Sequence, residues 1–98
     1  MVTFKQPIKF IWDKGNQDKN WLKHQVTTQE AEQVFFDPNK KIHPDKIHSQ
    51  KEARFILLGK TKNNRLLFII LTTRNSNIRI ISARDINKQE RPLYETTT

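Results

Sequence analysis

The sequence contains no cysteine and only two glycines, Gly15 and Gly59. Without cysteine the chain forms no disulfide and has no thiolate nucleophile, which agrees with a reducing compartment. Two isolated glycines cannot build a glycine-rich phosphate-binding loop, and neither a G-x-S-x-G nor an H-E-x-x-H motif is present. We therefore expect neither nucleotide-dependent nor metallohydrolase chemistry, and no cofactor.

Long apolar segments are also missing. Residues 1–7 lack the apolar core of a secretion signal, and the apolar run at residues 66–71 is too short to span a membrane. We expect a cytoplasmic protein that does not associate with a membrane.

Acidic residues are absent from residues 53–84, although the chain as a whole has a formal charge of +8. The basic residues in this segment are Arg54, Lys60, Lys62, Arg65, Arg74, Arg79 and Arg84. A surface of this kind indicates an anionic partner, which would be RNA, DNA or an acidic protein segment. The alternative is a basic surface that serves only solubility.

The hydrophobic pattern predicts a single α+β domain covering residues 1–98. Residues 66–71 are apolar and rich in strand-forming side chains, so we place them in a central strand, because an exposed edge of this composition would aggregate. The other predicted strands are residues 8–12, 53–59 and 78–84. The result is a small antiparallel sheet of about four strands, in the chain order β-α-α-β-β-β-α.

Two helices are predicted before the main strands and a short one after them. The first covers residues 16–24, and the second follows Thr27, which begins a capping box with Glu30, and ends before Pro38. Ala31, Val34 and Phe35 give the second helix a buried stripe. Residues 39–51 are predicted to form a loop. The terminal helix would begin near Asn87, and Pro92 would interrupt it.

The last two strands are predicted to form a hairpin around the dipeptide Asn75-Ser76. This register places Leu71 opposite Ile80 and Leu67 opposite Arg84. Arg65 then becomes a diagonal neighbour of Arg84 on the same face, roughly 7–8 Å away.

A second hairpin is predicted around Asn63-Asn64. It places Lys60 opposite Leu67 and Lys62 opposite Arg65. Both lysines would thus lie beside Arg65 and Arg84, in a cationic cluster that a slip of one residue in either hairpin would scatter.

Three metal-capable side chains, His43, Asp45 and His48, lie within six positions. Their spacing matches no zinc or iron pattern, so proton transfer by His48 or His43 fits the sequence better than a metal site, and a solvated loop histidine fits it better than either. His24 would complement the end of the first helix.

A cationic cluster can cleave RNA without a metal. Each scissile phosphate lies beside a 2′-hydroxyl, and arginines stabilise the charge that develops when this hydroxyl attacks. The protein then has to position the strand and move two protons.

Several segments resemble the BrnT toxins. They are Phe10-Ile11-Trp12-Asp13, Asn20-Trp21-Leu22-Lys23-His24, Val34-Phe35-Phe36-Asp37-Pro38, His48-Ser49 with Glu52 and Arg54, Gly59, Ile78-Arg79-Ile80-Ile81-Ser82-Ala83-Arg84, Glu90-Arg91 and Tyr94. The resemblance implies a fold similar to the RelE toxins and a ribonuclease that halts translation. It also implies a BrnA-like ribbon-helix-helix antitoxin, in a heterotetramer that neutralises the toxin and binds its own promoter DNA.

The resemblance also suggests roles for individual residues. Those implied to be catalytic are Arg65, Arg84, His48, Glu52 and Tyr94, with His48 or Glu52 as the base. Those implied to contact RNA are Lys23, Arg54, Lys60, Lys62, Arg74 and Arg79. Two positions depart from the pattern. Gln25 replaces a glycine at a position that favours left-handed backbone, and Pro92 disturbs the helix that carries Tyr94.

We therefore expect a metal-independent endoribonuclease toxin. The alternative is a non-catalytic module that binds RNA or an acidic protein through the same basic face. DNA binding by this chain alone is less well supported, because no helix has a basic, base-reading face.

Overall fold

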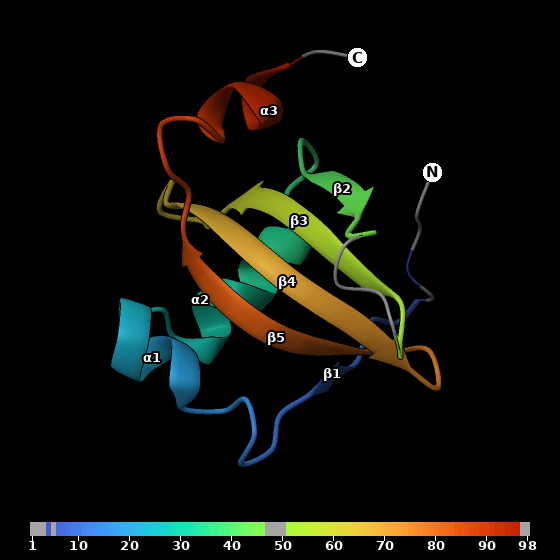
Figure 1. The fold of residues 1–98 in the computed structure, drawn as a ribbon. Coiled ribbons are helices and arrows are strands. Elements are labelled where there is room, and N and C mark those ends of the chain that lie inside the picture. The colour runs from blue at the N-terminus through green and yellow to red at the C-terminus, as the bar shows by residue number, and fades with distance from the viewer. Residues whose placement is uncertain (1–3, 5, 47–50, 97–98) are drawn as a thin grey trace.

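The computed structural model describes residues 4, 6–46 and 51–96. Its centre is a five-stranded mixed sheet in the order β1-β5-β4-β3-β2, shown in Figure 1. The strands are β1 (Phe10–Ile11), β2 (Lys41–Pro44), β3 (Arg54–Lys60), β4 (Leu66–Arg74) and β5 (Asn77–Asp85). The helices are α1 (Lys19–His24), α2 (Thr28–Gln33), the 3₁₀ helix η1 (Val34–Phe36) and α3 (Arg91–Glu95). The α+β class is confirmed, and β4 lies at the centre as predicted.

The sheet differs from the prediction in two ways. It has five strands instead of about four, and β1 pairs with β5 in parallel. The extra strand, β2, lies within residues 39–51, where we predicted a loop. It is an edge strand of four residues with one large apolar side chain, Ile42, so it carries almost no periodic signal.

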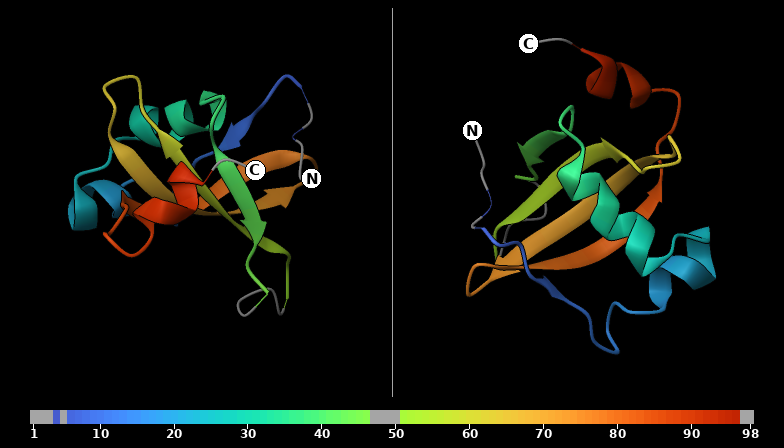
Figure 2. Two further views of the ribbon diagram at one scale, coloured as in Figure 1. Left: turned by 90° about the horizontal axis from the view of Figure 1, so that it is seen from above. Right: turned by 180° about the vertical axis from the view of Figure 1, so that it is seen from behind.

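The helices α1, α2 and η1 cover one face of the sheet, which we call the helix-covered face (Figure 2). The predicted capping box is confirmed, because the Glu30 amide donates to Thr27 Oγ1 and the Thr27 amide donates to Glu30 Oε1, both at 3.0 Å. The predicted stripe of Ala31, Val34 and Phe35 is buried. Gly59 lets η1 approach closely, since a Cβ atom there would lie 2.8 Å from the Val34 carbonyl oxygen.

The first helix is shorter than predicted because residues 14–18 form turns before it. Gln25, which follows it, has φ of 53°, so this position does require left-handed backbone. Two buried side chains around α1 complete the exposed edge of β5. Asn16 donates to the Ile80 carbonyl at 2.9 Å, and Asn20 accepts from the Ala83 amide at 2.9 Å. These two side chains form hydrogen bonds with backbone groups of β5 that the two-residue strand β1 is too short to pair with.

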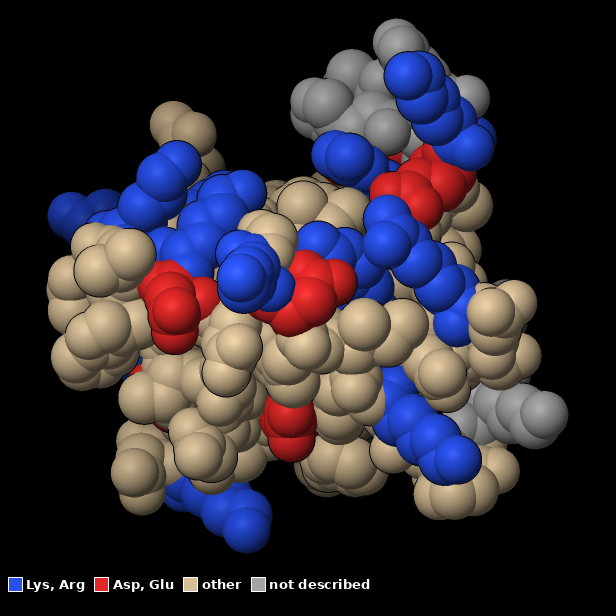
Figure 3. All heavy atoms as spheres, turned by 90° about the horizontal axis from the view of Figure 1, so that it is seen from below, with Lys and Arg blue, Asp and Glu red and all other residues tan. Residues whose placement is uncertain are grey.

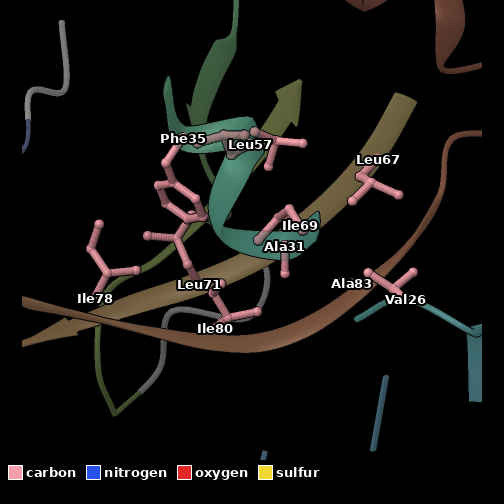
Figure 4. Close-up of a cluster of buried hydrophobic side chains, with 11 residues drawn as sticks. Val26, Ala31, Phe35, Leu57, Leu67, Ile69, Leu71, Ile78, Ile80 and Ala83 are labelled. Carbon is pink, nitrogen blue, oxygen red and sulfur yellow. The ribbon is translucent and has the colours of Figure 1, made fainter. Parts of the chain in front are cut away.

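The main core lies between the sheet and the helices, as Figure 4 shows. It consists of Val26, Ala31, Val34, Phe35, Leu57, Leu67, Ile69, Leu71, Ile78, Ile80 and Ala83. Alternate residues of the same strands point to the opposite face. No helix in the described part of the chain is long and apolar enough to cross a membrane.

Within the described part of the chain, the opposite face is covered only at one end, where α3 packs over it (Figure 2). There Tyr94 forms a second, smaller cluster with Leu58 and Leu66. We predicted that Pro92 would interrupt the terminal helix, and this was wrong. Pro92 lies in the first turn of α3, where a missing amide hydrogen is tolerated. Asn87 caps the preceding turn, accepting from the Glu90 amide at 2.9 Å.

Both hairpins depart from the predicted register by one residue. In the β4–β5 hairpin, Asn75 and Ser76 form the loop with positive φ, and Leu71 pairs with Ile80, as predicted. A bulge next to this pair then shifts the strands, so Arg84 pairs with Phe68 instead of Leu67.

In the β3–β4 hairpin, only Asn64 has a positive φ, which is 66°. The Thr61 amide donates to the Arg65 carbonyl, which leaves three residues in the loop. Lys60 therefore pairs with Leu66, and Leu67 pairs with Gly59.

Candidate functional site on the sheet

The predicted pocket between Arg65 and Arg84 does not exist, because the two side chains lie on opposite faces of the sheet. Arg65 precedes Leu66 on β4 and contacts the helices, whereas Arg84 lies over the ring of Phe68 on the other face. The bulge in the β4–β5 pairing causes this separation, because a slip of one residue moves Arg84 to the other face.

Arg65 links three segments on the helix-covered side. Its Nε and Nη2 atoms donate to both oxygens of Asp85, at 2.7 and 3.0 Å, and Nη1 contacts Glu30 Oε2 at 3.1 Å. It also donates to the carbonyls of Gln25 at 2.9 Å and His24 at 3.1 Å. The hydrogen bond to Asp85 is the main reason that the pKa of Arg65 is raised. Arg65 thus fixes the end of α1 and the start of α2 to the end of β5.

Arg84 is held by a carboxylate but keeps free donors. Its Nη1 and Nη2 atoms donate to the two oxygens of Glu90 at 2.8 and 2.7 Å, and its guanidinium lies 4.0 Å from the Phe68 ring centroid. The hydrogen bond from Arg84 lowers the pKa of Glu90 and is the largest cause. A guanidinium has five N–H donors, and Nη1 also binds the Asp85 carbonyl. The Nε hydrogen and one Nη2 hydrogen have no partner among the described residues.

The face that carries Arg84 is the open face of the sheet. Pairing places Lys41, Leu58, Phe68 and Arg84 in one row across the strands, and His43, Ile56, Ile70 and Ser82 in the next. Ile56, Phe68 and Ile70 are half-buried, so an apolar stripe lies along the middle. The cations around it are Lys41, Arg54, Lys60, Arg74, Arg79 and Arg84.

Among these cations, Arg74, Arg79 and Arg84 form ion pairs with acidic side chains. Arg79 pairs with Asp13 at 2.7 Å, and Arg74 pairs with Glu52 at 3.5 Å. Figure 3 looks onto the β1 and β5 edge of the sheet, beside the open face, and shows Lys and Arg interleaved with Asp and Glu at this edge. The open face is therefore cationic with short-range ion pairs, and it is not a uniformly positive surface.

Tyr94 fixes α3 in place at one end of the open face. Its hydroxyl donates to Asp37 Oδ2 at 2.6 Å, and its side chain is buried against Leu58 and Leu66. Burial, followed by the bond to Asp37, raises the pKa of Tyr94, so the phenol keeps its proton near neutral pH. Lys60 joins the same group, since its amide donates to Asp37 Oδ2 at 2.8 Å and its Nζ lies 6.0 Å from the Tyr94 ring.

A hollow of about 430 Å³ lies beside Tyr94. It is lined by Gln33, Phe36, Asp37, Pro38, Asn39, Lys60, Thr61, Lys62, Asn64 and Tyr94. Of the cations predicted to gather around the two arginines, Lys60 and Lys62 thus lie together here, and Arg65 lies elsewhere.

The remaining predicted residues are dispersed. Lys23 lies on α1, on the helix-covered side, and His48 lies outside the described residues. The backbone amide of Asp45 bonds to the Arg54 carbonyl at 2.8 Å, and within the described ranges no three metal-capable side chains gather.

Two residues of the open face, Lys41 and His43, were not predicted to lie on a strand. His43 is exposed and pairs with Ile56. His43 was missed as a strand residue because residues 39–51 were predicted to form a loop. The alternation of Ile42 with the polar Lys41 and His43 spans only three residues, which is too short to predict a strand.

Comparison with known proteins identifies the chain. A family model described as ribonuclease toxin, BrnT, of type II toxin-antitoxin system matches residues 12–90, a range that begins directly after β1 and includes β2, β3, β4 and β5. A search of curated proteins finds no match. The matched range covers most of the chain, and it contains the open face and its arginines. The chain therefore belongs to the BrnT family of ribonuclease toxins of type II toxin–antitoxin systems.

Proposed function

We propose that this toxin is a metal-independent endoribonuclease that binds single-stranded RNA across the open face of its sheet. The observation that carries the proposal is the half-buried stripe of Ile56, Phe68 and Ile70 with cations on both sides. Sheets that bind single-stranded RNA combine such surfaces, because bases stack on apolar and aromatic side chains while cations neutralise the phosphates.

The proposed reaction uses a group that the RNA itself supplies. The 2′-hydroxyl gives its proton to a base and attacks the adjacent phosphorus, and the P–O5′ bond breaks. The leaving 5′-oxygen takes a proton from water, so the products are a 2′,3′-cyclic phosphate and a 5′-hydroxyl. Arg84, through the N–H groups that Glu90 leaves free, stabilises the charge on the phosphate. The cost of this arrangement is that Glu90 partly offsets the positive charge.

We propose His43 as the proton acceptor, since it is the described histidine that lies on the open face. Because β3 and β4 lie between His43 and Arg84, we propose that His43 takes the proton through one water molecule. Imidazole groups exchange protons near neutral pH, which suits attack by a hydroxyl. Glu52 and His48 stay alternative predictions for the base. For Arg65 and Tyr94 we propose structural roles, because their polar atoms are engaged with carboxylates.

Membership in a type II system implies an antitoxin. We propose that a BrnA-like ribbon-helix-helix protein covers the open face, so that RNA and antitoxin compete. The RelE-like fold, the heterotetramer and repression of the operon's own promoter belong to this proposal, as does growth arrest by inhibited translation.

The test is incubation of the purified toxin with single-stranded RNA in EDTA, followed by analysis of the RNA ends. We expect cleavage with 2′,3′-cyclic phosphate ends and no cleavage of the matching DNA, which lacks the 2′-hydroxyl. His43→Gln should lower the rate by about 100-fold or more, whereas His24→Gln, an exposed histidine on α1, should not.

Two results would contradict the proposal. RNA that binds but stays intact would favour the non-catalytic binding module. Cleavage that EDTA abolishes and a divalent metal restores would exclude the metal-independent mechanism.

A further inference from the structure

The hollow beside Tyr94 lies between η1, the β3–β4 loop and α3. Its volume of about 430 Å³ falls in the range of small-molecule sites, which is roughly 300–1,000 Å³. It adjoins the open face, since Lys60 contributes to both and pairs with Leu66, one row from Phe68 and Arg84. A strand of RNA that runs from the open face past Tyr94 would reach the hollow.

Phe36 gives the hollow an aromatic surface. Its side chain is 62% exposed, whereas the preceding residue, Phe35, is 1% exposed in the core. The chain thus directs two consecutive phenylalanines to different places, and Phe36 lines the hollow. An exposed ring at the rim of a hollow that also presents lysines and amides is a surface on which a nucleobase can stack.

The charged groups of the hollow favour an anion that lies beside this ring. Lys60 and Lys62 are both exposed. The one carboxylate in the lining, Asp37, already accepts from the Tyr94 hydroxyl and the Lys60 amide at Oδ2 and from the Asn39 amide at Oδ1. Because these bonds outweigh the effect of burial, the pKa of Asp37 is lowered, so it stays ionised and held by the protein.

Side-chain amides complete the lining. Gln33, Asn39 and Asn64 contribute groups that both donate and accept hydrogen bonds. Such groups can bind the polar edges of an unpaired base, which is how proteins distinguish bases in single strands of RNA.

From these observations we propose that the hollow is a nucleotide subsite. An unpaired RNA base stacks on Phe36 and meets the amides, and Lys60 and Lys62 bind the phosphates on either side of it. The inference rests on the proposed function, because it extends the RNA path from the open face to a second position. It identifies the substrate as unpaired RNA and gives the protein a means of base preference.

The test measures binding of two cleavage-resistant probes by fluorescence anisotropy. One is a 2′-O-methyl RNA oligonucleotide, and the other has the same backbone with its bases removed. Phe36→Ala should weaken binding of the first probe roughly 5- to 100-fold, the range for loss of one stacked base. Phe36→Trp should restore binding, whereas Phe36→Leu, which is apolar but not aromatic, should not. The abasic probe should bind Phe36→Ala and wild type equally.

Two further variants refine the test. Trp21→Ala is the matched control, since Trp21 is 53% exposed on α1, away from the hollow, and its removal should leave binding unchanged. Lys62→Ala should weaken both probes and reduce the salt dependence of binding by about one counterion.

The outcomes separate this inference from the proposed function. If wild type binds and cleaves RNA and both Phe36→Ala and Phe36→Leu bind the base-bearing probe like wild type, the subsite is wrong and the proposed function stands. If wild type neither binds nor cleaves RNA, both fall. If Phe36→Ala keeps its affinity for RNA but loses affinity for the antitoxin, the hollow is a protein-binding site and the subsite is again wrong.

Discussion

Replacing Arg84 with alanine is expected to lower the rate of RNA cleavage by about 100- to 1,000-fold while the protein stays folded. Arg84 is the arginine of the open face whose guanidinium lies on an aromatic ring, with two N–H donors left over after its bonds to Glu90 and Asp85. In the Arg84→Ala variant, no other arginine would be placed over Phe68 to stabilise the charge that develops on a phosphate bound at that position. Single-turnover cleavage with saturating protein measures the effect.

Two further variants show whether the effect is specific to the guanidinium of Arg84. Arg84→Lys keeps the charge but cannot bind both Glu90 oxygens in the same plane, so its rate should fall between those of the alanine variant and wild type. Lys19→Ala removes a cation from α1 and should cleave like wild type. An Arg84→Ala protein that is folded, as judged by urea unfolding, and cleaves within threefold of wild type would remove Arg84 from the mechanism.

Replacing Arg65 with alanine should act on stability instead, lowering the free energy of unfolding by about 2–3 kcal/mol at pH 7. The change removes the guanidinium that donates to Asp85 and to two backbone carbonyls, and among the described residues it leaves Glu30 with only its bonds from Thr27. The value lies below that of a fully buried ion pair, because 27% of the Arg65 side chain and 60% of the Asp85 side chain remain exposed. Arg91→Ala is the control. It breaks an exposed contact of 3.9 Å to Glu95 and should change stability by less than about 0.5 kcal/mol.

The Arg65 effect should also depend on pH. The hydrogen bond from Arg65 is the main cause of the lowered pKa of Asp85, whose ordinary value is 3.8. Glu30, ordinarily 4.5, is also lowered, because hydrogen bonds from Thr27 and Arg65 outweigh its burial. Groups with a lowered folded pKa contribute stability above their unfolded pKa and lose it as the pH falls. The difference between wild type and Arg65→Ala should therefore be constant near neutral pH and shrink below about pH 4. A difference that is the same at pH 3 and pH 7 would contradict this assignment.

The sequence was sufficient to predict the elements that depend on local chemistry. The run at residues 66–71 did become the central strand β4, the capping box of Thr27 formed, and Asn75 and Ser76 made the tight loop. Each of these depends on side chains that lie within a few residues of one another, so the signal is contained in a short window.

The register was missed, although the sequence contains a signal for it. Ile80 and Ala83 are both buried, and a strict alternation from Ile80 would have turned Ser82 and Arg84 into the core. The change of phase at Ile81 therefore required a bulge. In the other hairpin, the predicted register would have placed Lys60 on the same face as the buried Leu67. Both registers would have been corrected by rejecting any pairing that turns a charged side chain, such as Lys60 or Arg84, toward the core face.

The partners of the cations could not be predicted from the chain order. The segment from residue 53 to 84 has no acid, yet its arginines meet carboxylates from other segments, including Asp13, Glu30, Asp85 and Glu90. The segment itself has no acidic residue, but carboxylates from elsewhere in the chain neutralise part of its positive charge in the folded protein. What remains for RNA is the set of donors and the apolar stripe that these pairs leave exposed.

The most direct test of the open face is an NMR titration of the isotope-labelled toxin with a cleavage-resistant 2′-O-methyl RNA. We expect the amide signals of Ile56, Phe68, Ile70 and Arg84 to shift with a common affinity, while those of α1 and α2 stay in place. Shifts confined to α1 and α2, with the open face unaffected, would contradict the account.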